Sequence, residues 1–301
     1  MLATEYRAEL VLDVKNSTGE CPFWNEQEQS LYWVDIPQRK LYRFIPAQNR
    51  LNQWVAPEML GCIVPSCDGV HWLAAAQSGM FVLHPANDLT VGFHRIASID
   101  HPLEGMRFND GRCDRQGRFI AGTMVMNPPE PQCVGKIYQL QGDGSLLTLL
   151  EGFVTPNGMA FSPDGKKMYL SDSSASVRQV WAFDYDVETG TPSNQRGFLN
   201  MAEFEGRPDG AAIDTDGCYW ICGIDAGCVH RYTPDGRLVG KVRVPVAKPT
   251  MCAFGDEDLR TLYVTSIRPN ATPDSGSLDG GLFAARVVDA QGMPEARCAT
   301  H

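Results

Sequence analysis

Short apolar runs alternate with turn-forming residues along the whole chain. Between clusters of Gly, Pro, Asn and Asp lie runs of four to seven residues rich in Val, Ile, Leu, Tyr and Trp, the pattern of short β-strands. Six of these runs carry an aromatic residue, at 31–34, 71–74, 118–121, 167–170, 219–222 and 261–264. No segment of helical length combines a 3.6-residue apolar period with capping residues. The pattern therefore predicts an essentially all-β fold.

A small or polar residue precedes each aromatic run and recurs along the chain. These residues are Glu20, Gly61, Asn109, Asn157, Asp209 and Thr250, at intervals of 41, 48, 48, 52 and 41 residues. A repeat of this length with four short strands per unit is typical of a β-propeller. The sequence therefore predicts a single domain over residues 1–301, a six-bladed β-propeller of four-stranded blades. Residues 8–13 form a strand before the first unit, which we expect to complete the last blade and close the ring.

Turn-forming residues surround several of these recurring positions. Asn157 and Asp209 each stand between a proline and a glycine, and Asn109 is followed by Asp-Gly. Such phrases favour turns, which would place the polar side chains where the inner strands begin. Because the innermost strand of every blade lines the axial channel, we expect Asn109, Asn157, Asp209 and Glu20 to meet there.

Two carboxylates and two amides form an all-oxygen set, and such a set suits a hard divalent cation. The sequence predicts one divalent metal ion in the central channel, namely Ca²⁺, Mg²⁺ or Mn²⁺, with Zn²⁺ or Fe²⁺ as alternatives. Few protein ligands would leave coordination positions open to water and substrate. A single Asn-Gly or Asp-Gly is more often a simple turn, so the prediction depends on four such residues in register.

Charge and composition narrow the range of partners. The net charge of −10, from 36 acidic and 26 basic residues, argues against nucleic acid or an anionic membrane surface. The chain has no run of 18 apolar residues and no signal-peptide pattern at its N-terminus, so we expect a cytoplasmic protein. Its ten cysteines show no CxxC pair, which indicates reduced thiols used as small core residues. The composition does not indicate an oligomeric state.

Four segments resemble the signature segments of the gluconolactonase/regucalcin (senescence marker protein) family of sugar lactonases. They are TGECPFW at 18–24, RFNDG at 107–111 with AGTM at 121–124, PNGMAFSPDG at 156–165, and RPDG at 207–210. The resemblance extends from about residue 10 to residue 283. It implies a six-bladed propeller that hydrolyses a sugar lactone with one divalent metal ion, held by Glu20, Asn157 and Asp209. It also implies that Asp209 is the general base and that Arg107 and Asn109 contact the substrate.

The chain departs from the family pattern at two places. Cys21 stands where many members have glycine, and MNPPEP at 126–131 replaces the acidic, lid-like segment that we associate with the animal members. The first change leaves the neighbouring Glu20 intact. The second leaves the identity of the sugar open, and with it the question of whether 126–131 acts as a lid.

The residue types support the same chemistry. Lactone hydrolysis requires a polarised carbonyl and a positioned water; a metal ion can polarise the carbonyl, and Asp209 can accept the proton of the water. Arg107 can orient a hydroxyl or carboxylate through a forked hydrogen bond. Arg207 precedes Asp209 by two residues, just as Arg107 precedes Asn109. We interpret Arg207 as a structural residue.

Two other functions stay open. One is a non-catalytic propeller that binds a metal or a partner protein, and the other is an esterase or phosphotriesterase of the same fold. Mechanisms with a nucleophilic side chain find little support, because the chain lacks a G-x-S-x-G motif and its six histidines have no evident serine or cysteine partner.

Overall fold

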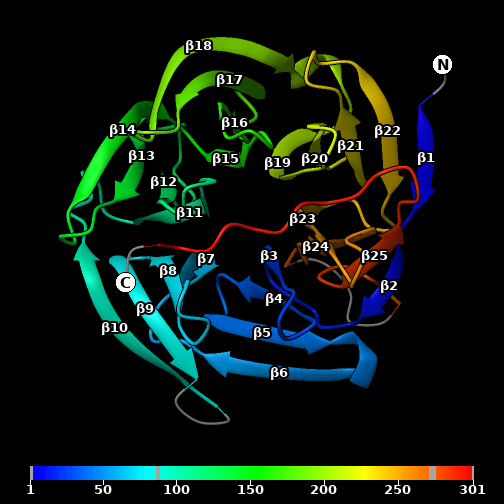
Figure 1. Ribbon diagram of the computed structural model, residues 1–301, viewed down its shortest axis with the longest axis horizontal. Helices are drawn as coiled ribbons and strands as arrows, with labels where there is room; N and C mark the ends of the chain where they lie inside the picture. Colours follow the sequence, from blue (N-terminus) through cyan, green and yellow to red (C-terminus); the bar gives the residue numbers. More distant parts are fainter. Residues whose placement is uncertain (1–2, 86–88, 271–275, 300–301) are drawn as a thin grey trace.

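Six β-sheets surround a central channel like the blades of a propeller (Figure 1). The structure is a computed structural model that describes residues 3–85, 89–270 and 276–299. Its described part contains no α-helix and two short 3₁₀ turns, Pro46–Gln48 and Met201–Glu203. The predicted all-β, six-bladed propeller is therefore confirmed.

Each blade begins with the strand nearest the channel and continues outward. The first three blades consist of β3 (Gly19–Asn25), β4 (Ser30–Asp35), β5 (Lys40–Ile45) and β6 (Arg50–Val55); β7 (Leu60–Pro65), β8 (Trp72–Ala76), β9 (Gly79–Pro85) and β10 (Val91–Ser98); and β11 (Met106–Cys113), β12 (Phe119–Val125), β13 (Gly135–Leu140) and β14 (Leu146–Phe153). The fourth and fifth blades consist of β15 (Pro156–Phe161), β16 (Lys167–Asp172), β17 (Gln179–Asp186) and β18 (Thr191–Asn200); and β19 (Arg207–Ile213), β20 (Tyr219–Ile224), β21 (Cys228–Tyr232) and β22 (Leu238–Arg243). The sixth blade consists of β23 (Pro249–Gly255), β24 (Thr261–Ser266), β25 (Leu282–Arg286) and β2 (Glu9–Leu12).

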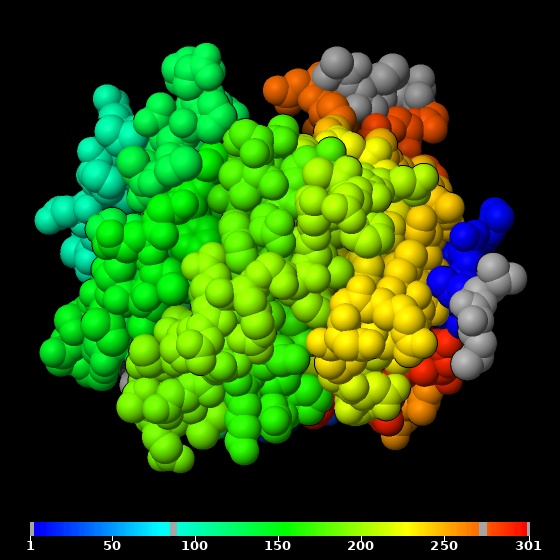
Figure 2. Space-filling view, turned by 90° about the horizontal axis from the view of Figure 1, so that it is seen from above, coloured from blue at the N-terminus to red at the C-terminus, as the bar shows by residue number. Residues whose placement is uncertain are grey.

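The N-terminal residues close the ring by joining two blades. As predicted, β2 completes the sixth blade, where it pairs antiparallel with β25. The sequence analysis missed β1 (Thr4–Arg7), which pairs parallel with β22 as a fifth strand of the fifth blade; in Figure 2 the blue N-terminal residues lie beside this gold segment. The short, mostly exposed run of β1 has no apolar pattern of its own. It is a strand because it covers the free edge of β22.

Apolar side chains fill the spaces between neighbouring blades. The six inner strands contact one another in a closed circle, and large aromatic side chains pack between the sheets outside that circle. Phe23 of the first blade meets Trp72 of the second edge to face at 5.3 Å, and Trp220 of the fifth meets Phe254 of the sixth at 5.4 Å. Such pairs add to the burial of apolar area. The core thus holds the inner strands in fixed positions around the channel.

The inner strands all run in one direction along the channel, so the ring has two different faces. We call the face where the inner strands begin the mouth face, and the opposite face the closed face. Residues 287–299 cross the closed face, as the red segment of Figure 1 shows. Backbone hydrogen bonds join this tail to three blades: Thr215 N–H donates to Gln291 O, Cys298 N–H to Pro65 O, and Ala299 N–H to Gly117 O.

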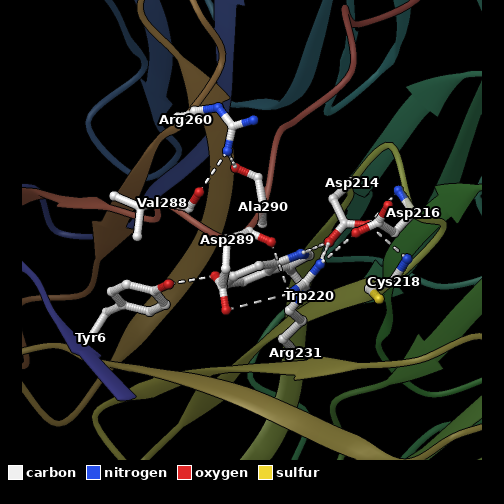
Figure 3. A network of polar contacts seen from close by, with 10 residues as sticks. All are labelled: Tyr6, Asp214, Asp216, Cys218, Trp220, Arg231, Arg260, Val288, Asp289 and Ala290. Atoms are coloured by element: carbon white, nitrogen blue, oxygen red, sulfur yellow. Dashed lines mark hydrogen bonds and ion pairs between the residues drawn. The ribbon is translucent and has the colours of Figure 1, made fainter. Parts of the chain in front are cut away.

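A polar network, buried at Arg231 and Asp214, fastens the tail and the N-terminus to the fifth blade (Figure 3). Arg231 forms an ion pair with Asp214 at 2.7 Å, and the same carboxylate accepts a hydrogen bond from the indole of Trp220 at 2.9 Å. Arg231 also lies 3.9 Å from Asp289 of the tail, to which the hydroxyl of Tyr6 donates. One arginine therefore connects β1, the fifth blade and the tail.

All ten cysteines are free thiols, and eight of them are buried, as the sequence predicted. Among the residues that the structure describes, no helix has the length and the hydrophobicity needed to cross a membrane.

Candidate active site and metal centre

A β-bulge interrupts the inner strand of every blade at the recurring position identified in the sequence. The pairing register shifts at Glu20/Phe23, Leu60/Cys62, Phe108/Gly111, Asn157/Ala160, Pro208/Ala211 and Pro249/Cys252. The predicted turns are therefore bulges within strands, which use the same Pro and Gly residues to bend the chain. A bulge re-aims the side chains beside it, and six of them in register line the mouth end of the channel.

Two of the six recurring positions, Gly61 and Thr250, make contacts between neighbouring blades. A Cβ atom on Gly61 would lie 2.4 Å from Phe108 O, so only glycine lets β7 approach β11 this closely. The hydroxyl of Thr250 donates to Gly19 O and lies 2.9 Å from the hydroxyl of Thr265. These contacts hold neighbouring inner strands together.

Asn157 and Asp209 meet across the fourth and fifth blades. The side-chain amide of Asn157 donates to Asp209 Oδ1, and its own Oδ1 accepts a hydrogen bond from Gly158 N–H at 3.1 Å. Both side chains are buried. Burial, with the nearby carboxylate of Asp110, raises the pKa of Asp209 well above its usual range, and the guanidinium of Arg207 counteracts this.

Glu20 faces Asp209 from the first blade. It keeps partial exposure at the mouth, and its Oε2 accepts a hydrogen bond from the backbone N–H of Cys21 at 3.1 Å. Burial of the carboxylate and the like charges of Asp209 and Asp110 raise the pKa of Glu20 well above its usual range. The channel therefore brings acidic groups together that repel one another.

Arg107 and Asn109 lie together on β11. Arg107 Nη1 donates to Asn109 Oδ1 at 2.8 Å and to Phe108 O at 2.7 Å, while Asn109 Nδ2 donates to Pro156 O of the fourth blade at 3.1 Å. Burial lowers the pKa of Arg107 to about 10, so its guanidinium is still charged at neutral pH. The pair forms a fixed set of donors beside the carboxylates.

Sequence reasoning missed two charged residues deeper in the channel. Asp110 accepts a hydrogen bond from Met159 N–H at 2.9 Å, which ties β11 to the bulge of β15. Arg112 donates to Ala211 O at 2.7 Å and forms an ion pair with Glu295 of the tail at 3.1 Å. The signal was a buried inner strand that carries four polar residues, whereas other inner strands carry fewer.

Glu295 of the tail pairs with Arg112 and helps to close one end of the channel. Beneath the candidate site lies a cavity of about 10 Å³, lined among others by Cys21, Arg112, Met251 and Glu295. That volume holds about one water molecule. A sugar-sized ligand therefore reaches the carboxylates only from the mouth face.

The donor set fits a hard divalent cation. Glu20 and Asp209 supply two opposed carboxylates, whose repulsion a cation between them would relieve, and Asn157 Oδ1 has a second lone pair available for coordination. Within the described ranges no group of three or more His, Cys, Asp or Glu side chains is arranged to hold a metal. The candidate centre is thus a mixed set of two carboxylates and one amide.

Comparison with known proteins identifies the family of this chain. The model of the SMP-30/gluconolactonase/LRE-like region matches residues 18–268. The chain is 38% identical to a 6-deoxy-6-sulfogluconolactonase of Pseudomonas putida over 272 residues, covering 89% of this chain and 91% of that one. It is 36% identical to an L-arabinolactonase of Azospirillum brasilense over 298 residues, covering 97% and 96% of the two chains.

A solved structure agrees with the fold along the whole chain. It is that of a calcium-binding protein, regucalcin, from Agrobacterium tumefaciens, with a TM-score of 0.88, 26% identity and full coverage of both chains. The matching region contains the bulged inner strands and all five side chains predicted for the site. This chain belongs to the SMP-30/gluconolactonase/LRE-like family.

Proposed function

We propose that this protein hydrolyses a sugar lactone to the corresponding sugar acid, with one divalent metal ion held by Glu20, Asn157 and Asp209. The observation that carries the proposal is the convergence of two opposed carboxylates and an amide at the open end of a channel whose other end is closed. The lactonases among the relatives support the same reaction class. One of them is named for a sulfonated sugar, which makes charged sugar lactones candidate substrates.

The bound cation would supply Lewis-acid polarisation of the lactone carbonyl, worth several kcal/mol. An all-oxygen donor set is consistent with Ca²⁺, Mg²⁺ or Mn²⁺, and the calcium-binding relative favours Ca²⁺ as the first ion to test.

The side chains of this protein perform the remaining steps. Asp209 accepts a proton from the water that attacks the carbonyl carbon. When the bond from that carbon to the ring oxygen breaks, the same carboxyl group returns the proton to the leaving oxygen. Arg107 and Asn109 donate hydrogen bonds that orient the lactone. One water is consumed, and the sugar acid is released through the mouth.

Two substitutions separate the base from the substrate contacts. Asp209→Asn keeps an oxygen for the metal, although it loses a negative charge and weakens metal binding as Glu20→Gln does. The amide cannot accept a proton, so at saturating metal we expect kcat to fall about 10²- to 10⁴-fold. Arg107→Ala removes a substrate contact and leaves the metal ligands unchanged, so we expect it to raise KM about tenfold. A panel of aldonolactones assayed with several divalent ions near neutral pH provides the measurement, because base hydrolyses lactones without an enzyme.

The outcomes distinguish the alternatives. Nearly full kcat in Asp209→Asn would remove this residue as the general base. Metal binding without turnover of any lactone would indicate a non-catalytic metal-binding propeller. Turnover of linear esters or phosphotriesters in preference to every lactone would indicate the esterase alternative.

A further inference from the structure

Arg207 occupies on β19 the position that Arg107 occupies on β11, but its side chain points elsewhere. Arg107 folds onto Asn109, two residues further along its strand. Arg207 turns to the rim instead, where its Nε donates to Asp225 Oδ2 at 2.8 Å and its Nη1 to Ser173 O at 3.1 Å. The other carboxylate oxygen of Asp225 pairs with the ammonium of Lys248.

This rim cluster of Arg207, Asp225 and Lys248 carries one net positive charge when Asp209 is not counted, whose charge the proposed metal ion would balance. Two cations share one carboxylate, and the side chains of Arg207 and Lys248 are each 30% exposed. Among the described residues, Arg207 Nη2 has no hydrogen-bond partner, and Lys248 Nζ contacts only Asp225. Donors without partners and a net charge remain available to a ligand.

The rim cluster lies on the mouth face, beside the candidate general base. Asp225 directly follows β20, Lys248 directly precedes β23, and Arg207 is two residues before Asp209. Arg207 and Asp225 are both close enough to act electrostatically on the Asp209 carboxylate. The cluster thus flanks the site from the fifth and sixth blades, whereas Arg107 flanks it from the third.

An anionic substrate needs such a counter-charge here. The protein carries a net charge of −10, and the channel itself contains Glu20, Asp110 and Asp209. These carboxylates repel a negatively charged ligand unless cations stand near its charged group. Arg is suited to this role, because its planar fork binds carboxylate, sulfonate or phosphate oxygens through two parallel hydrogen bonds.

We infer that Arg207 and Lys248 form an anion subsite of the lactone-binding site, which takes an oxyanion substituent on the sugar remote from the lactone carbonyl. The inference rests on the proposed function and specifies its substrate class: a sugar lactone that carries a carboxylate, sulfonate or phosphate. Asp225 positions both cations and is not itself a ligand of the substrate.

Paired substrates test this subsite. The protein with bound metal is assayed with gluconolactone, which is neutral, and with a monolactone of glucaric acid, which carries a carboxylate. We expect a higher kcat/KM for the charged lactone than for the neutral one. In Arg207→Met and in Lys248→Met, the ratio of these two kcat/KM values should fall about five- to tenfold, the effect of losing one charge-assisted hydrogen bond. Arg237→Met is the matched control, because it removes one exposed positive charge of the same blade on the closed face and should preserve the ratio.

Several outcomes overturn the inference. An unchanged ratio in both rim variants, with or without a loss of thermal stability, would show that the rim cluster only joins blades. An equal fall in the Arg237→Met control would show an effect of net charge alone. If neither lactone is hydrolysed, the proposed function fails, and calorimetric binding of glucarate and gluconate then tests the anion subsite separately. Tighter binding of glucarate that is lost in Arg207→Met would support the subsite. Equal binding of the two acids would contradict it.

Discussion

At the scale of single residues, the carboxylates of Glu20 and Asp209 are like charges that meet in the channel. Each raises the free energy of the other through like charge, and burial in the channel adds to this cost. Asn157 and the backbone N–H of Cys21 donate hydrogen bonds to the pair but bring no positive charge. The divalent cation that we propose for this site would supply the charge that these ligands lack.

We expect Glu20→Gln to weaken Ca²⁺ binding at least about tenfold, because an amide keeps one oxygen ligand and loses the negative charge. The rise in Tm on addition of Ca²⁺ measures this affinity, since a ligand that binds only the folded state stabilises it. Without metal, the variant should be as stable as the unmutated protein or more stable, because one repulsion is gone.

Glu26→Gln is the control for that experiment, because Glu26 is exposed on the turn that follows β3. It removes the same charge without touching the channel. A Ca²⁺-dependent Tm shift that is identical in all three proteins would remove Glu20 from the metal site.

At the scale of the strand, equivalent bulges place different residues in the same backbone conformation. Cys21 and Gly158 follow Glu20 and Asn157 in equivalent bulges, and both have a left-handed backbone, with φ of 50° and 59°. Gly158 has no room for a side chain, since a Cβ atom would lie 2.6 Å from Tyr219 Oη. Cys21 has room, and its thiol exchanges hydrogen bonds with the backbone of Ile63.

The left-handed backbone of Cys21 predicts an inverted order of stability for two substitutions. Cys21→Ala and Cys21→Gly lose the same thiol contacts, but only glycine escapes the cost of a Cβ in this conformation, about 1–2 kcal/mol. We therefore expect Cys21→Gly to have the higher free energy of unfolding by about 1 kcal/mol, measured by denaturant titration. In an ordinary strand the order is opposite, because glycine is about 0.5–1 kcal/mol less favourable than alanine.

Cys252 provides the matched site, since it is also a buried cysteine of an inner strand and has no positive φ. There Cys252→Ala should be the more stable variant. The same order at both positions would contradict a strained backbone at Cys21.

For the whole molecule, the two ends of the chain perform different tasks. The N-terminal strands close the ring at its rim, and the C-terminal tail closes one end of the channel. The ion pair between Arg112 and Glu295 joins this tail to an inner strand, and the two side chains are only 10% and 17% exposed.

Loss of this buried pair should destabilise the protein. Glu295→Gln removes the ion-pair partner of the Arg112 guanidinium, whereas the nearby charge of Asp110 and the hydrogen bond to Ala211 O persist. We expect the free energy of unfolding to fall by about 1–3 kcal/mol, the cost of a buried group left partly unsatisfied. Glu151→Gln breaks the pair with Lys136. Because the Glu151 side chain is 61% exposed, this substitution should change stability by less than about 1 kcal/mol. Equal effects of the two substitutions would contradict a stabilising contribution of the Arg112–Glu295 pair.

The sequence by itself determined the ring and the positions of its site residues. Turn residues and two-residue alternation are local properties, and six units of similar length leave a single simple way to bury their apolar faces. The spacing therefore predicted the six blades, the closing strand β2 and the inner-strand positions of Glu20, Asn157 and Asp209.

Only the tertiary structure decided which long-range partner each side chain takes. Arg107 and Arg207 follow the same local pattern, yet one contacts Asn109 and the other Asp225, because the neighbouring loops differ. The parallel pairing of β1 and the pairing of Glu295 with Arg112 likewise join segments with no pattern of their own. Such contacts depend on distances across the closed ring, and these distances exist only once all six blades are assembled.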